Sequence, residues 1–286
     1  MKHLFSFLLL LLSINISGQI RGTVFDKTTG KAIQYANVFV KDQNIGSTSN
    51  IDGNFIINQV TKQKILVVSA IGYQTKEFIP QDDNVKIELA QKIYDLPEIT
   101  VIPKQNKRKL IIDSYRATSI KNYFACSSYP WIVTKYFRFS TDYNSTPFLK
   151  QIKLLTNCQN DSSSFNLRLI APNMTGEPGP DLLKNNLIIT ARSGKKNTKI
   201  DLSSFNIRFP QNGLFIAVEW LIIDRNVIHN KNNNGVSYDP MFGVILSEGN
   251  NDIWVYSGGK WKKTKLSPPG TNNQAKDLAI ELILTN

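Results

Sequence analysis

Short runs that alternate between apolar and polar residues dominate the chain from Gln19 onward. The run 35–41 alternates most regularly, with alanine and valine at the even positions and larger or polar residues at the odd ones. A period of two residues predicts a half-buried β-strand. Clusters of glycine, asparagine, aspartate and proline separate these runs, and no long stretch has helical periodicity. We therefore expect an all-β protein.

The first of these runs predict one antiparallel β-sandwich, because short strands follow one another at regular spacing. The apolar run 67–71 indicates a central strand covered on both faces. Asp52-Gly53 stands between two extended runs and predicts a hairpin, since glycine adopts positive φ without steric cost. The expected strands are 20–25, 35–41, 46–49, 55–58, 64–71, 76–79, 85–89 and 99–102.

Several short motifs follow one another in this region. They are Ile20-Arg21-Gly22-Thr23-Val24, Gly30-Lys31-Ala32-Ile33, Ala36-Asn37-Val38, Asp52-Gly53-Asn54-Phe55 and Ile71-Gly72-Tyr73, with Leu96–Val101 as a closing strand. In this order they resemble the carboxypeptidase-regulatory-like domain, a seven-stranded transthyretin-like sandwich, and we assign it to residues 19–102. The resemblance implies structural rather than catalytic residues. It also implies a setting at the N-termini of TonB-dependent receptors or in exported bacterial surface proteins.

Asp52 and Asn50 allow a second interpretation of the turn, because both carry oxygen ligands that calcium accepts. Aspartate and asparagine are also the usual residues of such turns. The EF-hand pattern is absent, and we expect the turn role rather than a metal site.

Residues 1–18 have the pattern of a secretory signal peptide, with Lys2 before an apolar block, 4–12, and small residues at Ser17-Gly18. The apolar block is shorter than the roughly 20 residues that span a bilayer. We expect cleavage near Gly18-Gln19 and no transmembrane segment. The exported protein would be periplasmic, secreted or peripherally bound at the cell surface.

Residues 103–125 begin with a polar, basic run and are expected to form a linker and lead-in. Alternation resumes from Trp131, and residues 126–286 predict a second antiparallel β-sandwich of jelly-roll type. Its expected strands are 131–139, 148–156, 165–171, 186–190, 199–202, 213–224, 241–247, 253–257, 260–263 and 277–284.

The formal net charge of +12 would suggest nucleic acid in a cytosolic protein. Export argues against that partner, so we interpret the charge as surface lysine with a bias towards anionic glycans or head groups. Cys126 and Cys158 could form a disulfide in an oxidising compartment. Their spacing in the sequence does not show whether they approach closely enough.

Glu219 interrupts an otherwise apolar strand. Phe215, Ala217 and Glu219 share one face by alternation, and the opposite face is also apolar. A buried carboxylate needs a partner, and Arg168 or Arg208 could supply it. The alternative is that Glu219 contacts a ligand or metal.

The segment 253–261 predicts a tight hairpin at Gly258-Gly259. Trp254 and Tyr256 share one face, and Trp261 lies across the turn. Such aromatic residues can stack against sugar rings, or they can stabilise the hairpin as cross-strand pairs.

Catalytic motifs are missing: the only histidine after the expected signal peptide is His229, and no zinc or nucleophile-elbow pattern occurs. Glu219 and Asp224 would point to opposite faces of one strand, which argues against a glycosidase pair. We therefore expect an exported, non-catalytic binding or interaction protein of the bacterial cell envelope, with an envelope protein or glycan as partner. A carbohydrate-binding module is the alternative, and a hydrolase with an unrecognised site the third. No cofactor or metal is expected.

Overall fold

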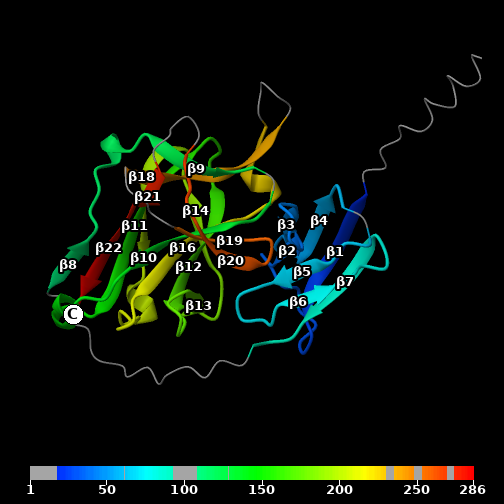
Figure 1. Ribbon diagram of the computed structural model, residues 1–286, viewed down its shortest axis with the longest axis horizontal. Helices are drawn as coiled ribbons and strands as arrows, with labels where there is room; N and C mark the ends of the chain where they lie inside the picture. Colours follow the sequence, from blue (N-terminus) through cyan, green and yellow to red (C-terminus); the bar gives the residue numbers. More distant parts are fainter. Residues whose placement is uncertain are drawn as a thin grey trace, which may run out of the picture.

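The computed structural model describes residues 18–60, 62–92, 108–127, 129–229, 235–247, 253–268 and 274–286. Within these ranges the chain forms two β-sandwiches that lie side by side (Figure 1), and its few 3-10 helices have three to five residues. No helix in these ranges is long and apolar enough to cross a membrane. The expected signal peptide (apart from Gly18), the closing strand 96–101 and most of the basic linker lie outside the described residues.

Within the described residues the first sandwich has seven strands in two sheets, which correspond to the first seven of the expected strands. One sheet has the order β4-β1-β7 and the other β3-β2-β5-β6; β1 and β7 are parallel and the other pairs are antiparallel. Alternate residues such as Ile20, Val24 and Val38 meet in the core between the sheets. The strands are β1 (Gln19–Asp26), β2 (Asn37–Val40), β3 (Gly46–Thr48), β4 (Asn54–Asn58), β5 (Leu66–Ser69), β6 (Lys76–Phe78) and β7 (Asn84–Leu89).

The Asp52-Gly53 turn does not close a hairpin, which corrects the expectation from sequence. It carries the chain from β3 in one sheet to β4 in the other. Asn50 Oδ1 accepts hydrogen bonds from the amides of Asp52 (3.0 Å) and Asn54 (2.9 Å), which is an Asx turn. Gly53 has φ of +76°, and a Cβ there would lie 2.6 Å from the carbonyl oxygen of Val24. The motif therefore fixes how the chain passes from one sheet to the other.

The second sandwich packs a seven-stranded sheet against an eight-stranded sheet. The first has the path β13-β12-β16-β10-β19-β20, with β14 beside β12. The second has the path β17-β18-β11-β22-β8, with β15 beside β11 and with β9 and β21 pairing with β18. Both sheets are larger than the four-stranded sheets of a simple jelly roll. Its centre is aromatic: Trp131 stacks on Trp220 with ring centroids 4.7 Å apart, and Phe242 meets Trp220 edge to face.

The strands of this domain are β8 (Lys109–Ile112), β9 (Asn122–Cys126), β10 (Ile132–Phe137), β11 (Phe148–Cys158), β12 (Ser163–Pro172), β13 (Pro178–Asp181), β14 (Leu187–Ala191), β15 (Gly194–Asp201), β16 (Leu214–Trp220), β17 (Val227–His229), β18 (Val236–Ser247), β19 (Ile253–Ser257), β20 (Lys260–Thr264), β21 (Gln274–Leu278) and β22 (Ile280–Thr285). The 3-10 helices are η1 (Ala117–Ser119), η2 (Thr141–Ser145), η3 (Ser203–Phe205) and η4 (Asp224–Asn226).

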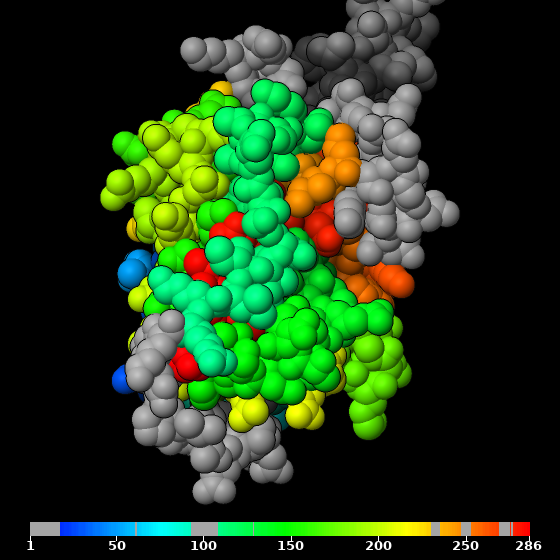
Figure 2. All heavy atoms as spheres, turned by 90° about the vertical axis from the view of Figure 1, so that its left-hand side faces the viewer, coloured from blue at the N-terminus to red at the C-terminus, as the bar shows by residue number. Residues whose placement is uncertain are grey.

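The expected lead-in, up to residue 125, instead belongs to the second sandwich. β8 pairs with β22, from Lys109 opposite Thr285 to Ile112 opposite Leu282, and β9 pairs with β18. Figure 2 shows this segment, in teal-green, lying across the red C-terminal strand. The domain therefore begins near Lys109, because the backbone hydrogen bonds of β8 and β9 are made with its sheet.

The two domains meet through the outer faces of two sheets. Phe39 on β2 packs edge to face against Tyr256 on β19, with ring centroids 5.9 Å apart. The turn of the β19–β20 hairpin reaches β5, where a Cβ on Gly259 would lie 3.2 Å from a methyl carbon of Val67. Figure 1 shows this hairpin extending towards β2 and β5. The contact brings together residues that are far apart in the sequence.

Candidate binding site between the two domains

A pocket of about 150 Å³ lies where the domains meet, and both contribute to it. Its most chemically distinctive lining residues come from the second domain: Arg168, Asp181, Glu219, Tyr256 and Trp261. The first domain adds polar side chains that include Tyr35, Asn37, Ser69, Tyr73 and Lys92.

Glu219 lies on β16 with its side chain on the outer face, as alternation predicts. Phe215 and Ala217 share this face, whereas Ile216, Val218 and Trp220 point into the sandwich core. Glu219 is only 2% exposed. A carboxylate so far from water needs hydrogen-bond donors, and it receives them from both domains.

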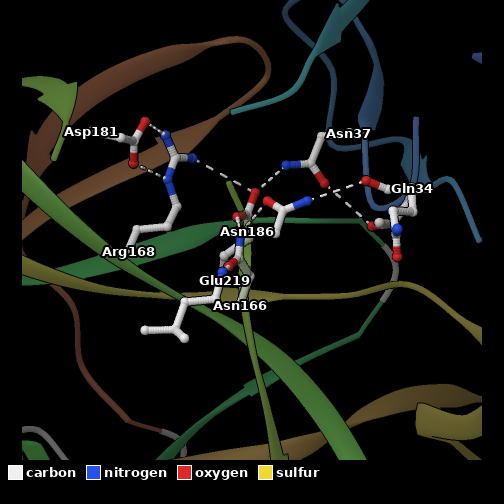
Figure 3. Close-up of polar contacts among 9 residues, drawn as sticks. Gln34, Asn37, Asn166, Arg168, Asp181, Asn186 and Glu219 are labelled. Atoms are coloured by element: carbon white, nitrogen blue, oxygen red, sulfur yellow. Dashed lines mark hydrogen bonds and ion pairs between the residues drawn. The ribbon is translucent and has the colours of Figure 1, made fainter. Parts of the chain in front are cut away.

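Two asparagines donate to Glu219 (Figure 3). Asn37 Nδ2 on β2 donates to Oε1, and Asn166 Nδ2 on β12 donates to Oε2 at 2.7 Å. Burial raises the pKa of Glu219 and outweighs the opposite influence of Arg168 and these amides. Neither asparagine was predicted from sequence. The sequence pattern that could have marked them is an asparagine within an alternating, strand-like run, because asparagine is uncommon in strands.

Arg168 is the partner of Glu219, with Nη1 and Oε1 3.7 Å apart. It also forms a bidentate ion pair with Asp181, with Nε to Oδ1 at 2.8 Å and Nη2 to Oδ2 at 2.7 Å. Burial disfavours the charged guanidinium, but Asp181 and Glu219 outweigh that effect and raise the pKa of Arg168. Arg208, the other partner considered, instead forms a backbone bridge with Phe148.

The network continues across the junction through amide groups. Asn166 Nδ2 also donates to Asn186 Oδ1 at 2.9 Å, and Asn186 Nδ2 donates to the carbonyl oxygen of Gln34 at 3.2 Å. Thr48 Oγ1 accepts from the amide of Ile222 at 3.0 Å. These bonds fix the orientation of one domain on the other, so the walls of the pocket have a defined geometry.

The aromatic residues of the hairpin lie on one face but do not form an open platform. Tyr256 is directly opposite Trp261, with ring centroids 5.3 Å apart. Together with Trp254 they pack against a small apolar cluster on the outer face of the sheet, and Phe39 of the first domain covers Tyr256. Tyr256 and Trp261 line the pocket, whereas Trp254 does not.

Cys126 and Cys158 are both buried, and no disulfide joins them in the structure. Phe242 on β18 pairs with Thr156 on β11 and with Phe124 on β9, so the strands that carry the two cysteines flank β18 from opposite edges. Two strand spacings amount to about 10 Å, beyond the reach of a disulfide. Burial raises the pKa of Cys158 to about 12.

The remaining titratable residues named from sequence lie elsewhere. His229 is exposed on β17, and Asp224 lines a different cavity from Glu219. Within the described ranges, no three His, Cys, Asp or Glu side chains are grouped so that they could hold a metal ion.

Comparison with known proteins bears on the first domain. Over 83 residues the chain is 37% identical to the TonB-dependent receptor SusC of Bacteroides thetaiotaomicron; the match covers 29% of this chain but only 8% of that receptor. Two structures of BcpA, the major pilin subunit of Bacillus cereus, align over 88% of this chain and 68% of theirs. Their TM-scores are 0.19 and 0.20, at 9% and 10% identity. The model of the CarboxypepD_reg-like domain matches residues 20–101, which confirms the domain that the sequence motifs indicate there.

Proposed function

We propose that this is an exported, non-catalytic binding protein of the bacterial cell envelope, and that it holds a small polar ligand in the pocket between its two domains. The observation that carries the proposal is the convergence of buried charged side chains from one domain and polar side chains from the other on one pocket. Concave sites with a few fixed polar groups are where proteins bind small ligands. The similarity of the first domain to a TonB-dependent receptor supports an envelope setting.

The pocket offers mainly hydrogen-bond acceptors and donors in fixed positions. Glu219 and Asp181 supply carboxylate oxygens, and Asn37 and Asn186 supply amides. Because hydrogen bonds between the domains set their positions, the ligand meets a preformed site and little ordering free energy is lost on binding.

A sugar is the second candidate ligand, because Tyr256 and Trp261 line the same pocket as the two carboxylates. Aromatic rings contact the apolar faces of a sugar while acidic and amide groups bind its hydroxyls. A cavity of about 150 Å³ accepts one six-membered ring. The site therefore favours a single terminal sugar unit over a run of stacked rings, and Trp254 has no part in it.

Binding of the mature chain, from Gln19, to a glycan array and to a library of small polar metabolites tests the proposal. For any ligand that the wild type binds in these screens, the Trp261→Ala variant is expected to have an affinity at least about tenfold lower. Tyr136→Ala is the matched control, since Tyr136 is an exposed aromatic residue on the same sheet outside the pocket. The proposal would be contradicted if neither screen yields a ligand, or if Trp261→Ala binds the ligand as tightly as the wild type. Cell fractionation and N-terminal sequencing test export: cytoplasmic full-length protein would refute that part.

A further inference from the structure

A second and larger cavity, of about 650 Å³, also lies between the domains. From the first domain, β3 and β4 line it; these two strands lie next to each other at the side of that sandwich (Figure 1). From the second domain, residues 222–224 line it together with Val227 on β17 and Val236 and Tyr238 on β18. We call this cavity the edge groove. Its volume is within the range of ligand sites, and none of the residues given for its lining also lines the pocket near Glu219.

β4 is an edge strand, and the direction of its free backbone groups follows from its pairing with β1. The amide of Val24 donates to the carbonyl oxygen of Gly53 at 2.9 Å, so these two residues form a hydrogen-bonded pair. Alternation along an antiparallel ladder then directs the backbone groups of Phe55 and Ile57 towards β1. The N–H and C=O groups of Ile56 and Asn58 point away from β1, at the open edge of the sheet.

This edge lacks the features that usually protect a sheet edge. The five residues of β4, Asn-Phe-Ile-Ile-Asn, contain no charge and no proline, and the side chain of Ile56 is 53% exposed. Proteins generally protect exposed edges with lysine, proline or bulges, because an unprotected edge is a template for another strand. The opposite edge strand of the same sheet, β7, does carry charges, at Lys86 and Glu88.

The charge of the edge groove also restricts what it binds. The chain has a formal net charge of +12, yet among the described residues that line the groove none is Lys or Arg, and Asp224 is the one carboxylate. The other lining side chains are aliphatic, aromatic, hydroxyl or amide. Two of its amides are already bonded along the edge, since Asn58 accepts from Gln19 at 2.7 Å and Asn54 accepts from Thr23 at 2.8 Å. The complementary occupant is uncharged.

We propose that the edge groove binds an extended, uncharged polypeptide segment of a partner protein, which adds to β4 as a further strand. A backbone strand presents N–H and C=O groups in the alternation that Ile56 and Asn58 offer, and other extended polymers do not. This is the strand-addition mode of peptide recognition. Five residues extend about 17 Å, the length of β4. The site is separate from the pocket at Glu219 and does not depend on the ligand proposed there.

The proposal is tested by selecting peptides that bind the mature protein from a phage-displayed library of random linear nonapeptides. The affinity of the selected peptides, made synthetically, is then measured by isothermal titration calorimetry. We expect enrichment of uncharged peptides that alternate aliphatic and polar residues, with micromolar Kd. Ile56→Pro removes the outward N–H, which an edge strand tolerates, and should weaken binding at least tenfold. Lys86→Pro places the same residue at the opposite edge of the sheet and should change Kd less than twofold. Circular dichroism checks that both variants fold.

If Ile56→Pro does not fold, Ile56→Lys keeps the backbone and adds a protecting charge, and it should weaken binding by the same tenfold. Three results would overturn the proposal. The library yields no peptide that binds the wild type, the selected peptides bind Ile56→Pro as well as the wild type, or they bind Lys86→Pro as weakly as Ile56→Pro. A concentration-dependent dimer that Ile56→Pro abolishes, without peptide binding, would also overturn it, because the edge would then pair with a second copy of the chain.

Discussion

Replacing Arg168 by methionine tests how much the charged network at the junction stabilises the protein. Arg168 lies between Asp181 and Glu219, whose side chains are 9% and 3% exposed. Arg168→Met keeps most of the side-chain volume but leaves two carboxylates in a site with little water. Removing one partner of a buried ion pair costs about 3–5 kcal/mol, because the remaining charge is uncompensated. We expect a decrease of this size in the free energy of unfolding.

Lys260→Met is the matched control. Lys260 Nζ lies 2.6 Å from Asp42 Oδ1, slightly closer than the 2.7 Å between Arg168 and Asp181. The Lys260 pair joins the two domains, whereas Arg168, Asp181 and Glu219 all lie in the second domain. The side chains of the Lys260 pair are 57% and 59% exposed, however. Water and salt screen such a pair, so its loss should lower the stability far less than the loss of Arg168. Burial, and not distance, separates the two expectations.

Urea unfolding followed by tryptophan fluorescence measures both variants. All four tryptophans lie in the second domain, which contains Arg168, so the signal reports the domain in question. With a slope of about 1–3 kcal/mol per molar urea, Arg168→Met should lower the midpoint by at least about 1 M. If it lowers the midpoint no more than Lys260→Met does, the reasoning is refuted, and the two carboxylates must be neutral or hydrated in the folded protein.

Three further changes give expected outcomes. Burial raises the pKa of Glu219 above its ordinary 4.5, so the carboxyl group keeps its proton to higher pH in the folded state than in the unfolded state. Stability should therefore fall as pH rises from about 4.5 through the raised pKa. Glu219→Gln should reduce this pH dependence, as measured by urea titrations at several pH values. Phe39→Ala, which removes a fully buried ring from Tyr256, should cost about 3–5 kcal/mol by calorimetry, and a cost under 1 kcal/mol would show that the domains do not pack there. Gly22→Ala would place a Cβ 2.2 Å from the carbonyl oxygen of Val85 and should cost at least about 2 kcal/mol, measured as a lower Tm; an unchanged Tm would contradict this.

The first sandwich was predictable because local signals mark its parts. Its strands alternate, its turns carry glycine and Asx residues, and its motifs occur in order. The orientation of Glu219 followed from the same alternation, which places Phe215 on its face of the strand and Trp220 on the opposite face. The residues around Gly53 predict a turn, but they do not tell whether the turn joins strands of one sheet or of two, because that depends on pairing with distant strands and not on the turn itself.

The junction between the domains could not be predicted in the same way. Asn37 and Glu219 are 182 residues apart in the sequence, and no local pattern connects them. Strands β8 and β9 were not predicted for a related reason. Their apolar spacing is mixed, and each pairs with a strand more than 100 residues later in the sequence, β8 with β22 and β9 with β18. Local periodicity predicts which face of a strand is apolar, but it does not tell which surface will cover that face.

The pairing of β8 with β22 and of β1 with β7 gives the two domains different responses to mechanical force. Lys109 lies opposite Thr285 in an antiparallel pair, so tension applied through the two ends of the second domain opens its hydrogen bonds one after another. In the first domain β1 and β7 are parallel, and tension from Gln19 and Leu89 loads all their hydrogen bonds together. When the chain is stretched in a single-molecule experiment, the second domain should unzip at the lower force, lengthening the protein while the first domain stays folded; rupture of the first domain at the lower force would refute this.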